Sequence, residues 1–448
     1  MNLWKALGIA GLTAGMLGLY GCASSGNLAE AVQMESGTAS HVVLNVASAP
    51  EKAGYGQTGN QAGAAAEKNG SGTENGSGGE QSEQAQPEQE ESAADESGEH
   101  APAGKYDSEL ADAKYCAANR IYKKETADPE EISLVFAGDI LFDDSYAIMA
   151  SLNQRGRGIQ GGISEELLAE MRGADLFMVN NEFPYTNRGT PTAGKQFTFR
   201  AKPERASYLL DMGADIVSLA NNHASDYGEV SLTDTVDTLN GIGMPFVGAG
   251  RNLNEAKSPI YFIANDKKIG ILSASQIERM ENPSTKGATE TSPGVFRCLH
   301  PEQLLAAIEE TKKACDYVIV YIHWGTESTD VIDHWQREQA PMIAAAGADL
   351  IIGDHPHVLQ PIGYCGSTPV VYSLGNYLFN SKTRDTCLVK VLLDENGLKR
   401  LQFIPAVQKN CQVSMAAGGE KERILAYMRS ISPEVTMDGE GYVEKIAE

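Results

Sequence analysis

The chain has 448 residues, 42% of them hydrophobic, which is enough for one large domain or two ordinary ones. Its 36 lysines and arginines against 60 aspartates and glutamates give a formal net charge of −24. A surface that binds nucleic acid must neutralise phosphates with basic residues, so this balance argues against a nucleic-acid partner. Much of the acidic excess falls within residues 51–110.

The first 22 residues have the layout of an export signal. Fifteen uncharged residues follow Lys5, and this stretch is too short for a permanent bilayer span. The ending Leu19-Tyr20-Gly21-Cys22 resembles a bacterial lipobox. We therefore predict that residues 1–21 are a lipoprotein-type signal peptide and that Cys22 carries the lipid. The alternative is an uncleaved signal anchor, and both interpretations place the rest of the chain on the extracytoplasmic face of the cell membrane.

Residues 22–130 are predicted to form a disordered, acidic linker. They are dominated by Gly, Ser, Ala, Glu and Gln, and contain the run "GSGTENGSGGEQSEQ". Such a composition offers too little apolar surface to offset the entropy lost on ordering. A flexible coil of this length reaches about 50–60 Å from its anchor. We expect it to tether a folded domain through a layer of the cell envelope.

Folded sequence begins near residue 131, where a helix-then-strand pattern recurs. Each copy has a helical stretch, a small residue followed by Asp, an apolar run and then polar residues. The copies span residues 167–182, 206–223, 306–325 and 342–357. Their short runs are apolar on both faces, as central parallel strands are. Repeated units of this kind predict an α/β fold with a largely parallel sheet.

Residue types that bind metals stand at the ends of these apolar runs. They are Asp139, Glu182, Asn222 with His223, His323, and His355 with His357. In open α/β sheets, ligands bind beyond the carboxyl ends of the strands, so we expect this set to meet at one edge. Carboxylate, amide and imidazole groups are ligands of borderline divalent metals such as Zn, Mn or Fe. Two such ions about 3.5–4 Å apart can activate water and clamp the oxygens of a phosphoryl transfer, so we expect hydrolysis at phosphorus.

Each member of this set also has a local interpretation. Asp139 can cap a turn, Glu182 can be a solvated loop acid, and residues 221–223 can form a side-chain-bonded turn. His323 can be a core histidine with satisfied hydrogen bonds. The "HPH" pair is harder to explain locally, because Pro356 fixes the backbone between two potential ligands. The shared position at strand ends favours the joint interpretation.

The remaining cysteines and serines argue against three other kinds of site. Six cysteines follow Cys22, and none forms a CxxC pair, so zinc-ribbon and thioredoxin-type sites are excluded. Disulfides are permitted outside the cytoplasm, and the spacing leaves both disulfides and buried free thiols open. Ser273 and Ser275 lack the Gly-x-Ser-x-Gly context, which argues against a serine hydrolase.

A family resemblance rests on motifs that occur in the order "FAGDILF", "SLANNHASDYG", "YIHWGTE", "IIGDHPHVLQPI" and "VVYSLGNYLFN". They resemble the motif series of the CapA family of bacterial capsule or poly-γ-glutamate synthesis proteins, over roughly residues 132 to 407. That family is similar to the calcineurin-like metallophosphoesterases. The resemblance therefore implies an α/β/β/α sandwich with a di-metal site at the sheet edge.

The resemblance also implies a role for each residue of the set. The implied metal ligands are Asp139, Glu182 as the bridge, Asn222, His323, His355 and His357. His223 is implied to be the acid near the leaving group. The cofactors would be divalent metal ions, two in number, with Mn, Zn and Fe as the candidates.

One departure from the metallophosphoesterase pattern concerns its first motif. Those enzymes usually begin with Asp-x-His, whereas this chain has Leu141 two residues after Asp139, so one imidazole is missing. Asp143 and Asp144 are candidate replacements, and without one of them a metal would bind weakly. Residues 195–200 resemble the family's segment between its second and third motifs. Here Lys195 or Arg200 could face an anionic substrate, and an ordinary edge strand is the alternative.

These observations predict a domain at residues 131–410, followed by a closing amphipathic helix and tail at residues 411–448. The resemblance implies an anchored protein of capsule or poly-γ-glutamate biosynthesis with a phosphoesterase-like hydrolytic site. The implied partners are an anionic capsule polymer or its intermediates, the membrane through the lipid anchor, and other capsule-synthesis components. The alternative is a non-catalytic assembly or transport component for the same polymer.

Overall fold

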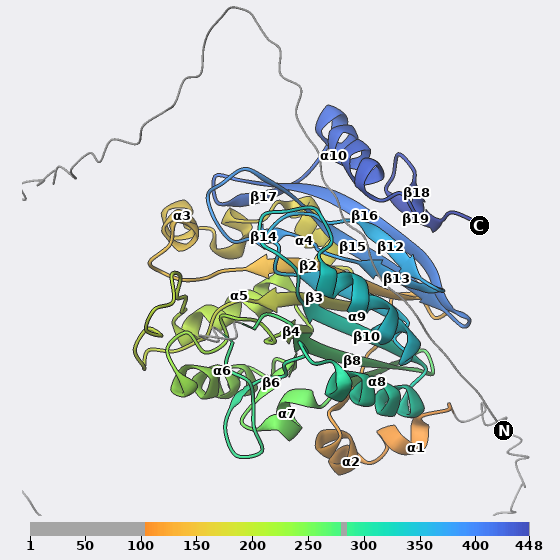
Figure 1. The fold of residues 1–448 in the computed structure, drawn as a ribbon, viewed down its shortest axis with the longest axis horizontal. Coiled ribbons are helices and arrows are strands. Elements are labelled where there is room, and N and C mark those ends of the chain that lie inside the picture. The colour runs from red at the N-terminus through yellow and green to blue at the C-terminus, as the bar shows by residue number, and fades with distance from the viewer. Residues whose placement is uncertain (1–103, 279–284, 448) are drawn as a thin grey trace, which may run out of the picture. The chain divides into compact units, whose positions relative to one another are not determined.

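The computed structural model describes residues 104–278 and 285–447, and within them two large β-sheets form the centre of the fold (Figure 1). The predicted signal peptide, Cys22 and most of the linker lie outside the described residues. The first sheet has seven described strands in the order β1-β7-β8-β10-β11-β13-β12. Their bounds are β1 Ile121–Lys123, β7 Ile260–Ala264, β8 Lys267–Ser275, β10 Tyr317–His323, β11 Leu350–Asp354, β13 Thr368–Val371 and β12 Ile362–Cys365.

The second sheet has ten strands among the described residues. Its main order is β18-β19-β16-β15-β2-β3-β4-β5, with β14 beside β2 and β17 beside β16. Their bounds are β2 Ile132–Ile140, β3 Leu176–Asn181, β4 Ile216–Ser218, β5 Phe246–Val247, β14 Asn376–Leu378, β15 Arg384–Asp394, β16 Gly397–Lys409, β17 Gln412–Met415, β18 Val435–Met437 and β19 Tyr442–Lys445. A short ribbon pairs β6 (Ala249–Gly250) with β9 (Gly294–Val295).

The two sheets pack face to face, with apolar side chains between them. Leu134 and Phe136 of β2 belong to the same buried cluster as Ile319 and Tyr321 of β10. The Tyr321 hydroxyl also donates a hydrogen bond to the carbonyl of Ala137, 2.8 Å away, and so joins the two sheets directly. Because successive side chains of a strand point to opposite faces, the residue between Leu134 and Phe136 and the residue between Ile319 and Tyr321 face outward.

Helices cover both outer faces (Figure 1). Val135 of β2 shares a buried cluster with apolar residues of α4, α5 and α6, and Val320 of β10 shares another with residues of α8 and α9. The described helices are α1 Asp107–Leu110, α2 Ala113–Ala118, α3 Ala147–Arg155, α4 Glu165–Arg172, α5 Ser207–Met212, α6 Glu229–Gly241, α7 Leu253–Lys257, α8 Glu302–Ala314, α9 His334–Ala345 and α10 Gly418–Ile431. The four layers confirm the predicted α/β/β/α sandwich.

The strands that carry the candidate residues are parallel, as predicted, but they are divided between the two sheets. Strands β2, β3, β4 and β5 run parallel in one sheet. Strands β8, β10, β11 and β13 run parallel in the other. Antiparallel strands complete both sheets, including the long β15–β16 hairpin beside β2. The repeated pattern marks each strand but carries no information about which sheet the strand joins.

The predicted linker extends too far toward the C-terminus. Residues 104–130 are ordered by contacts with distant parts of the fold: β1 pairs with β7, Lys268 forms a buried ion pair with Glu109, and the Tyr106 hydroxyl donates to Asp316 at 2.8 Å. These partners lie more than 130 residues away in the chain, so the composition of the segment does not reveal them. The prediction of disorder is wrong for this stretch.

The C-terminal segment belongs to the same core. Helix α10 lies within residues 411–448, where an amphipathic helix is predicted, and its apolar face buries Ile424, Leu425 and Met428. Strands β17 and β19 both pair with β16, so the C-terminal segment is part of the second sheet. The six described cysteines are free thiols. None of the described helices is both long and apolar enough to cross a membrane.

Candidate metal centre

The predicted site residues meet where the carboxyl ends of parallel strands from both sheets face each other. Asp139 lies near the end of β2, and Glu182 directly follows β3. The pair Asn222 and His223 follows β4, His323 ends β10, and the two histidines of the "HPH" motif follow β11. The expectation of a common edge is therefore met, although two sheets contribute to it instead of one.

One group of ligand atoms surrounds the ring of His323. Its Nε2 lies 2.8 Å from Asn222 Oδ1, 3.0 Å from His355 Nδ1 and 3.6 Å from Glu182 Oε1. Its Nδ1 lies 2.8 Å from Asp354 Oδ1, and this carboxylate holds the ring proton on Nδ1. A lone pair on Nε2 then faces the oxygens of Asn222 and Glu182, which are themselves acceptors. A cation at their centre would satisfy all of them.

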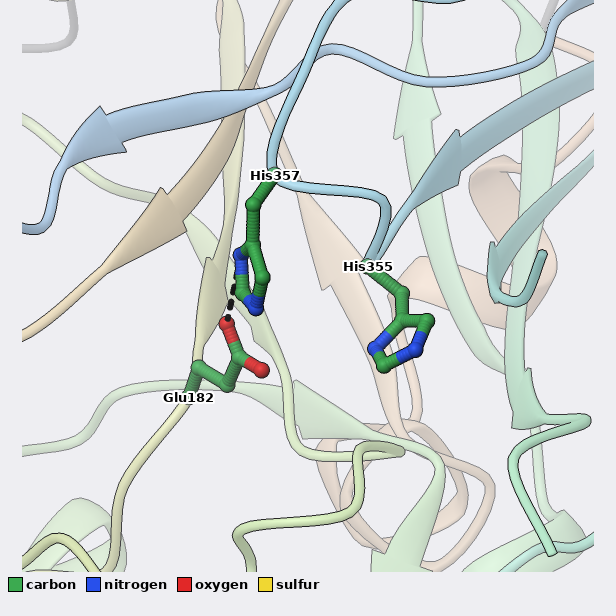
Figure 2. Close-up of side chains that lie close together, drawn as sticks. All are labelled: Glu182, His355 and His357. Carbon is green, nitrogen blue, oxygen red and sulfur yellow. Dashed lines mark ion pairs between the residues drawn. The ribbon is translucent and has the colours of Figure 1, made fainter. Parts of the chain in front are cut away.

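A second group surrounds His357. Its Nδ1 lies 3.0 Å from Asp139 Oδ2 and 4.0 Å from Glu182 Oε2. The two oxygens of Glu182 thus face different groups, which suits a bridging carboxylate. Figure 2 shows this carboxylate directly below the ring of His357 and to the left of the ring of His355, with its ion pair to His357 drawn as a dashed line. These three residues each offer a ligand atom within 4.8 Å of the other two, so the two groups lie next to each other.

Buried negative charge is the main electrostatic feature of the site. Asp139, Glu182 and Asp354 are all completely buried, and neither oxygen of the Glu182 carboxylate has a hydrogen-bond partner among the described residues. Burial raises the pKa of Glu182 well above its usual range, and the charges of Asp139 and Asp354 raise it further. An unpaired buried carboxylate is costly, and bound cations are the usual way in which proteins compensate such charge.

The imidazole rings respond to the same environment. Burial lowers the pKa of His323 to about 3, so its ring is neutral at physiological pH and can act as a ligand. Burial also raises the pKa of Asp139, but the hydrogen bond from His357 and the positive charge of that ring outweigh this effect, and the net pKa is lowered. Asp139 is therefore ionised, as a metal carboxylate must be.

The backbone of the "HPH" loop is strained. His355 and His357 have φ angles of +95° and +57°, which residues with a Cβ rarely adopt. Such conformations cost on the order of 1–3 kcal/mol and gather at functional sites, where the surrounding structure enforces them. Here the Ser328 backbone N–H donates to the carbonyl of Pro356 at 2.8 Å and holds the loop in place.

His223 lies beside the ligand groups rather than within them. Its Nε2 is 4.0 Å from Glu182 Oε1, and its Nδ1 is 2.6 Å from Asp226 Oδ2. Asp226 also accepts hydrogen bonds from the Phe199 backbone and from the ammonium group of Lys195. Burial lowers the pKa of His223, and the nearby carboxylate of Asp226 opposes this effect. The ring is thus oriented by Asp226, with Nε2 directed toward the site.

Two expectations about neighbouring residues are wrong. Asp143 accepts from Ser145 and from the Arg200 backbone, and Asp144 pairs with Arg205, so neither carboxylate replaces the missing imidazole. Residues 195–200 have neither helix nor strand conformation, which excludes the edge-strand interpretation.

Sequence reasoning also missed several buried polar residues. Asp354 orients His323, Asp226 orients His223, and Asn180 donates to Asp139 at 2.8 Å. Asp354 ends β11 directly before His355, so the rule that found the other strand-end residues would have found it as well. Asn376 lies against His357 and belongs to the "SLGN" motif, whose only signal in the sequence is its family likeness.

An α/β/β/α sandwich that gathers carboxylate, amide and imidazole groups at its strand ends defines a metallophosphoesterase-like protein. The family model of the bacterial capsule synthesis protein PGA_cap matches residues 133–381, more than half of the chain. The chain belongs to this family.

Individual relatives agree with the family assignment. The chain is 33% identical to the PGA biosynthesis protein CapA of Bacillus subtilis over 63% of this chain and 73% of that protein. It is 27% identical to the capsule biosynthesis protein CapA of Bacillus anthracis over 69% of this chain and 77% of that protein. Among solved structures, the sulfate thiohydrolase SoxB of Thermus thermophilus is 14% identical, with a TM-score of 0.35, over 69% of this chain and 60% of that one. This last likeness is too distant to support a functional argument.

Proposed function

We propose that this protein is a membrane-anchored, extracytoplasmic component of capsule or poly-γ-glutamate synthesis that hydrolyses a phosphoester with the help of two divalent cations. The proposal depends above all on the buried Glu182 carboxylate, which lacks hydrogen-bond partners among the described residues and lies between two groups of ligand atoms. The family and its relatives support the link to capsule synthesis. The substrate would be an anionic polymer of the envelope or one of its phosphorylated intermediates.

The residues present fit two cations of the Mn, Zn or Fe type. Asn222, His323 and His355 would hold one of them, Asp139 and His357 would hold the other, and Glu182 would bridge both. When bound, such ions polarise a phosphoryl oxygen and lower the pKa of water. Asp354 would keep His323 in the ligand tautomer by accepting its Nδ1 proton.

His223 would move a proton at its Nε2. Asp226 accepts the proton on Nδ1 and thereby fixes the ring with Nε2 toward the site. Because burial lowers the pKa of His223, the free protein holds this ring neutral at pH 7. A negatively charged phosphoester next to Nε2 favours the protonated ring, so the anionic substrate itself would prepare the acid that protonates the leaving group.

A metal titration combined with a phosphodiester assay tests this proposal. Wild-type protein should bind about two Mn²⁺ ions and hydrolyse bis(p-nitrophenyl) phosphate, while His357→Ala should retain one ion and lose at least about 100-fold in rate. His300→Ala is a matched control, since that histidine is exposed. Wild-type protein that binds no divalent metal after chelation and reconstitution would refute the proposed site.

Membrane attachment rests on the export signal and on Cys22, both outside the described residues. Wild-type protein should incorporate an azido-palmitate label, and Cys22→Ser should lose it. Wild-type protein that stays in the membrane fraction without incorporating the label would instead indicate an uncleaved signal anchor and would contradict the lipid-anchored form of the proposal.

A second function is favoured by Leu141, which occupies the position where the metallophosphoesterase pattern has a ligand histidine. Its side chain is buried in the apolar cluster beneath the outer helices. A protein with a weakened cation site could serve as a non-catalytic assembly or transport component for the same anionic polymer. This alternative predicts polymer formation that does not depend on His223.

A further inference from the structure

The two cation-binding groups have unequal numbers of ligands. The group around His323 has four ligand residues when Glu182 is included, the other three being Asn222, His355 and His323 itself. Among the described residues, the group assigned to His357 consists of Asp139, Glu182 and His357. Leu141 offers no ligand atom, and Asp143 and Asp144 have other partners. The second group therefore has room for one more ligand.

Asn376 lies at the open side of this group. Its Oδ1 is 2.8 Å from His357 Nδ1, the same ring atom that lies 3.0 Å from Asp139 Oδ2. Its side chain is buried, and strand β14 pairs with β2 so that Asn376 stands directly beside Asp139. Three oxygen-bearing side chains, from Asp139, Glu182 and Asn376, thus surround one imidazole nitrogen.

Two glycines make this close approach of β14 and β2 possible. A Cβ on Gly138 would lie 1.9 Å from the carbonyl oxygen of Gly375, a distance that no side chain tolerates. Gly375 itself has a φ of +68°. The Ser373 hydroxyl accepts the Gly375 backbone N–H at 3.2 Å and donates to the carbonyl of Val358, which ties the turn to the loop that carries His357.

We infer that Asn376 is a metal ligand that replaces the missing imidazole and completes the coordination of the cation held by Asp139 and His357. This inference rests on the proposed two-cation site. It also explains the "SLGN" motif, because Ser373 and Gly375 shape the turn and Asn376 delivers its amide oxygen. Each cation receives one amide oxygen, from Asn222 on one side and from Asn376 on the other.

The composition of the completed group indicates which metal it prefers. Three oxygen ligands and one imidazole nitrogen favour a harder ion such as Mn²⁺, whereas the group with two imidazoles suits Zn or Fe. The two positions are therefore expected to differ in metal preference. Mn²⁺ is the appropriate probe for the group that contains Asn376.

The test is a titration of the full-length, chelator-treated protein with Mn²⁺ alone, with free Mn²⁺ followed by electron paramagnetic resonance. Wild type should bind about two ions. Asn376→Ala and Asn376→Leu should lose one of them through a fall in affinity of about 10–100-fold or more. Asn376→Asp, which keeps an oxygen in place, should retain both. Asn380→Ala is a matched control, because that amide oxygen accepts from Gln408 and faces no ligand group.

The outcomes separate this inference from the proposal beneath it. Wild type that binds no Mn²⁺ removes the basis of both. Wild type that binds two ions while every Asn376 variant binds two with equal affinity overturns the inference alone. Loss of one ion in Asn376→Asp as well as in Asn376→Ala also overturns it, because the oxygen atom would then be irrelevant. Loss in the Ala and Leu variants with retention in the Asp variant supports it.

Discussion

Replacing Glu182 with Gln should abolish the binding of both cations and at the same time make the cation-free protein more stable. In the absence of metal the Glu182 carboxylate is buried without a hydrogen-bond partner among the described residues, and it shares its surroundings with Asp139 and Asp354. A neutral amide removes the charge, and its N–H can donate to the lone pair on His323 Nε2. Glu182 is thus expected to be essential for cation binding and to destabilise the cation-free fold.

The gain in stability that Glu182→Gln gives the cation-free protein should increase with pH. Because burial raises the pKa of Glu182 in the folded protein, the wild-type carboxyl lowers stability at any pH above its unfolded pKa of about 4.3. The advantage of Glu182→Gln should therefore be present at pH 7 and disappear as the pH falls toward 4. Urea unfolding of chelator-treated protein at several pH values measures it.

Addition of metal should reverse the order of stability. A ligand at 100 times its dissociation constant stabilises a fold by about 2.7 kcal/mol, so wild type should gain on the order of 5 °C in melting temperature and Glu182→Gln should gain nothing. Asp175→Asn is a matched control: it is a buried carboxylate with backbone donors at Ala127 and Ser133, so its loss should destabilise the fold with or without metal. A metal-dependent rise in Glu182→Gln equal to that of wild type would contradict the bridging role.

The set of candidate ligands could be predicted because topology dictates where strand ends go. Each of the apolar runs ends in a polar residue, and parallel strands deliver those residues to one side of the fold whichever sheet they join. The family resemblance then added the four-layer architecture. That is why Glu182 and His357, 175 residues apart in the chain, could be placed together from the sequence alone.

Asn376 was missed because it acts through a contact between distant parts of the chain. It begins a short strand that pairs with β2 only because Gly138 and Gly375 allow the backbones to approach closely. The ordered stretch at residues 104–130 has the same explanation, since its ion pairs and strand pairing involve distant partners. The pattern of apolar residues indicates that a strand is buried. It does not identify the residues from other parts of the chain that lie beside the end of that strand.

Replacing His223 with Ala should reduce phosphodiester hydrolysis by about 10²–10⁴-fold while leaving two Mn²⁺ ions bound. The ring is 4.0 Å from Glu182 Oε1 and makes its short contact with Asp226 instead, so its proposed role is in proton transfer and not in cation binding. The rate of bis(p-nitrophenyl) phosphate hydrolysis and the Mn²⁺ stoichiometry are measured on the same preparation. His334→Ala serves as the control, because that side chain is 68% exposed.

The same substitution decides between the enzyme and the scaffold when it is made in the producing cell. If hydrolysis at this site drives polymer formation, a cell that carries His223→Ala should resemble one in which the gene is deleted. A scaffold needs only the fold and its surfaces, and replacing the buried ring of His223 should leave both in place. Polymer formation that survives His223→Ala but not deletion would therefore assign the protein to assembly. The cation-binding groups would then have a structural role. Glu182→Gln would in that case change polymer formation only to the extent that it changes the stability of the fold.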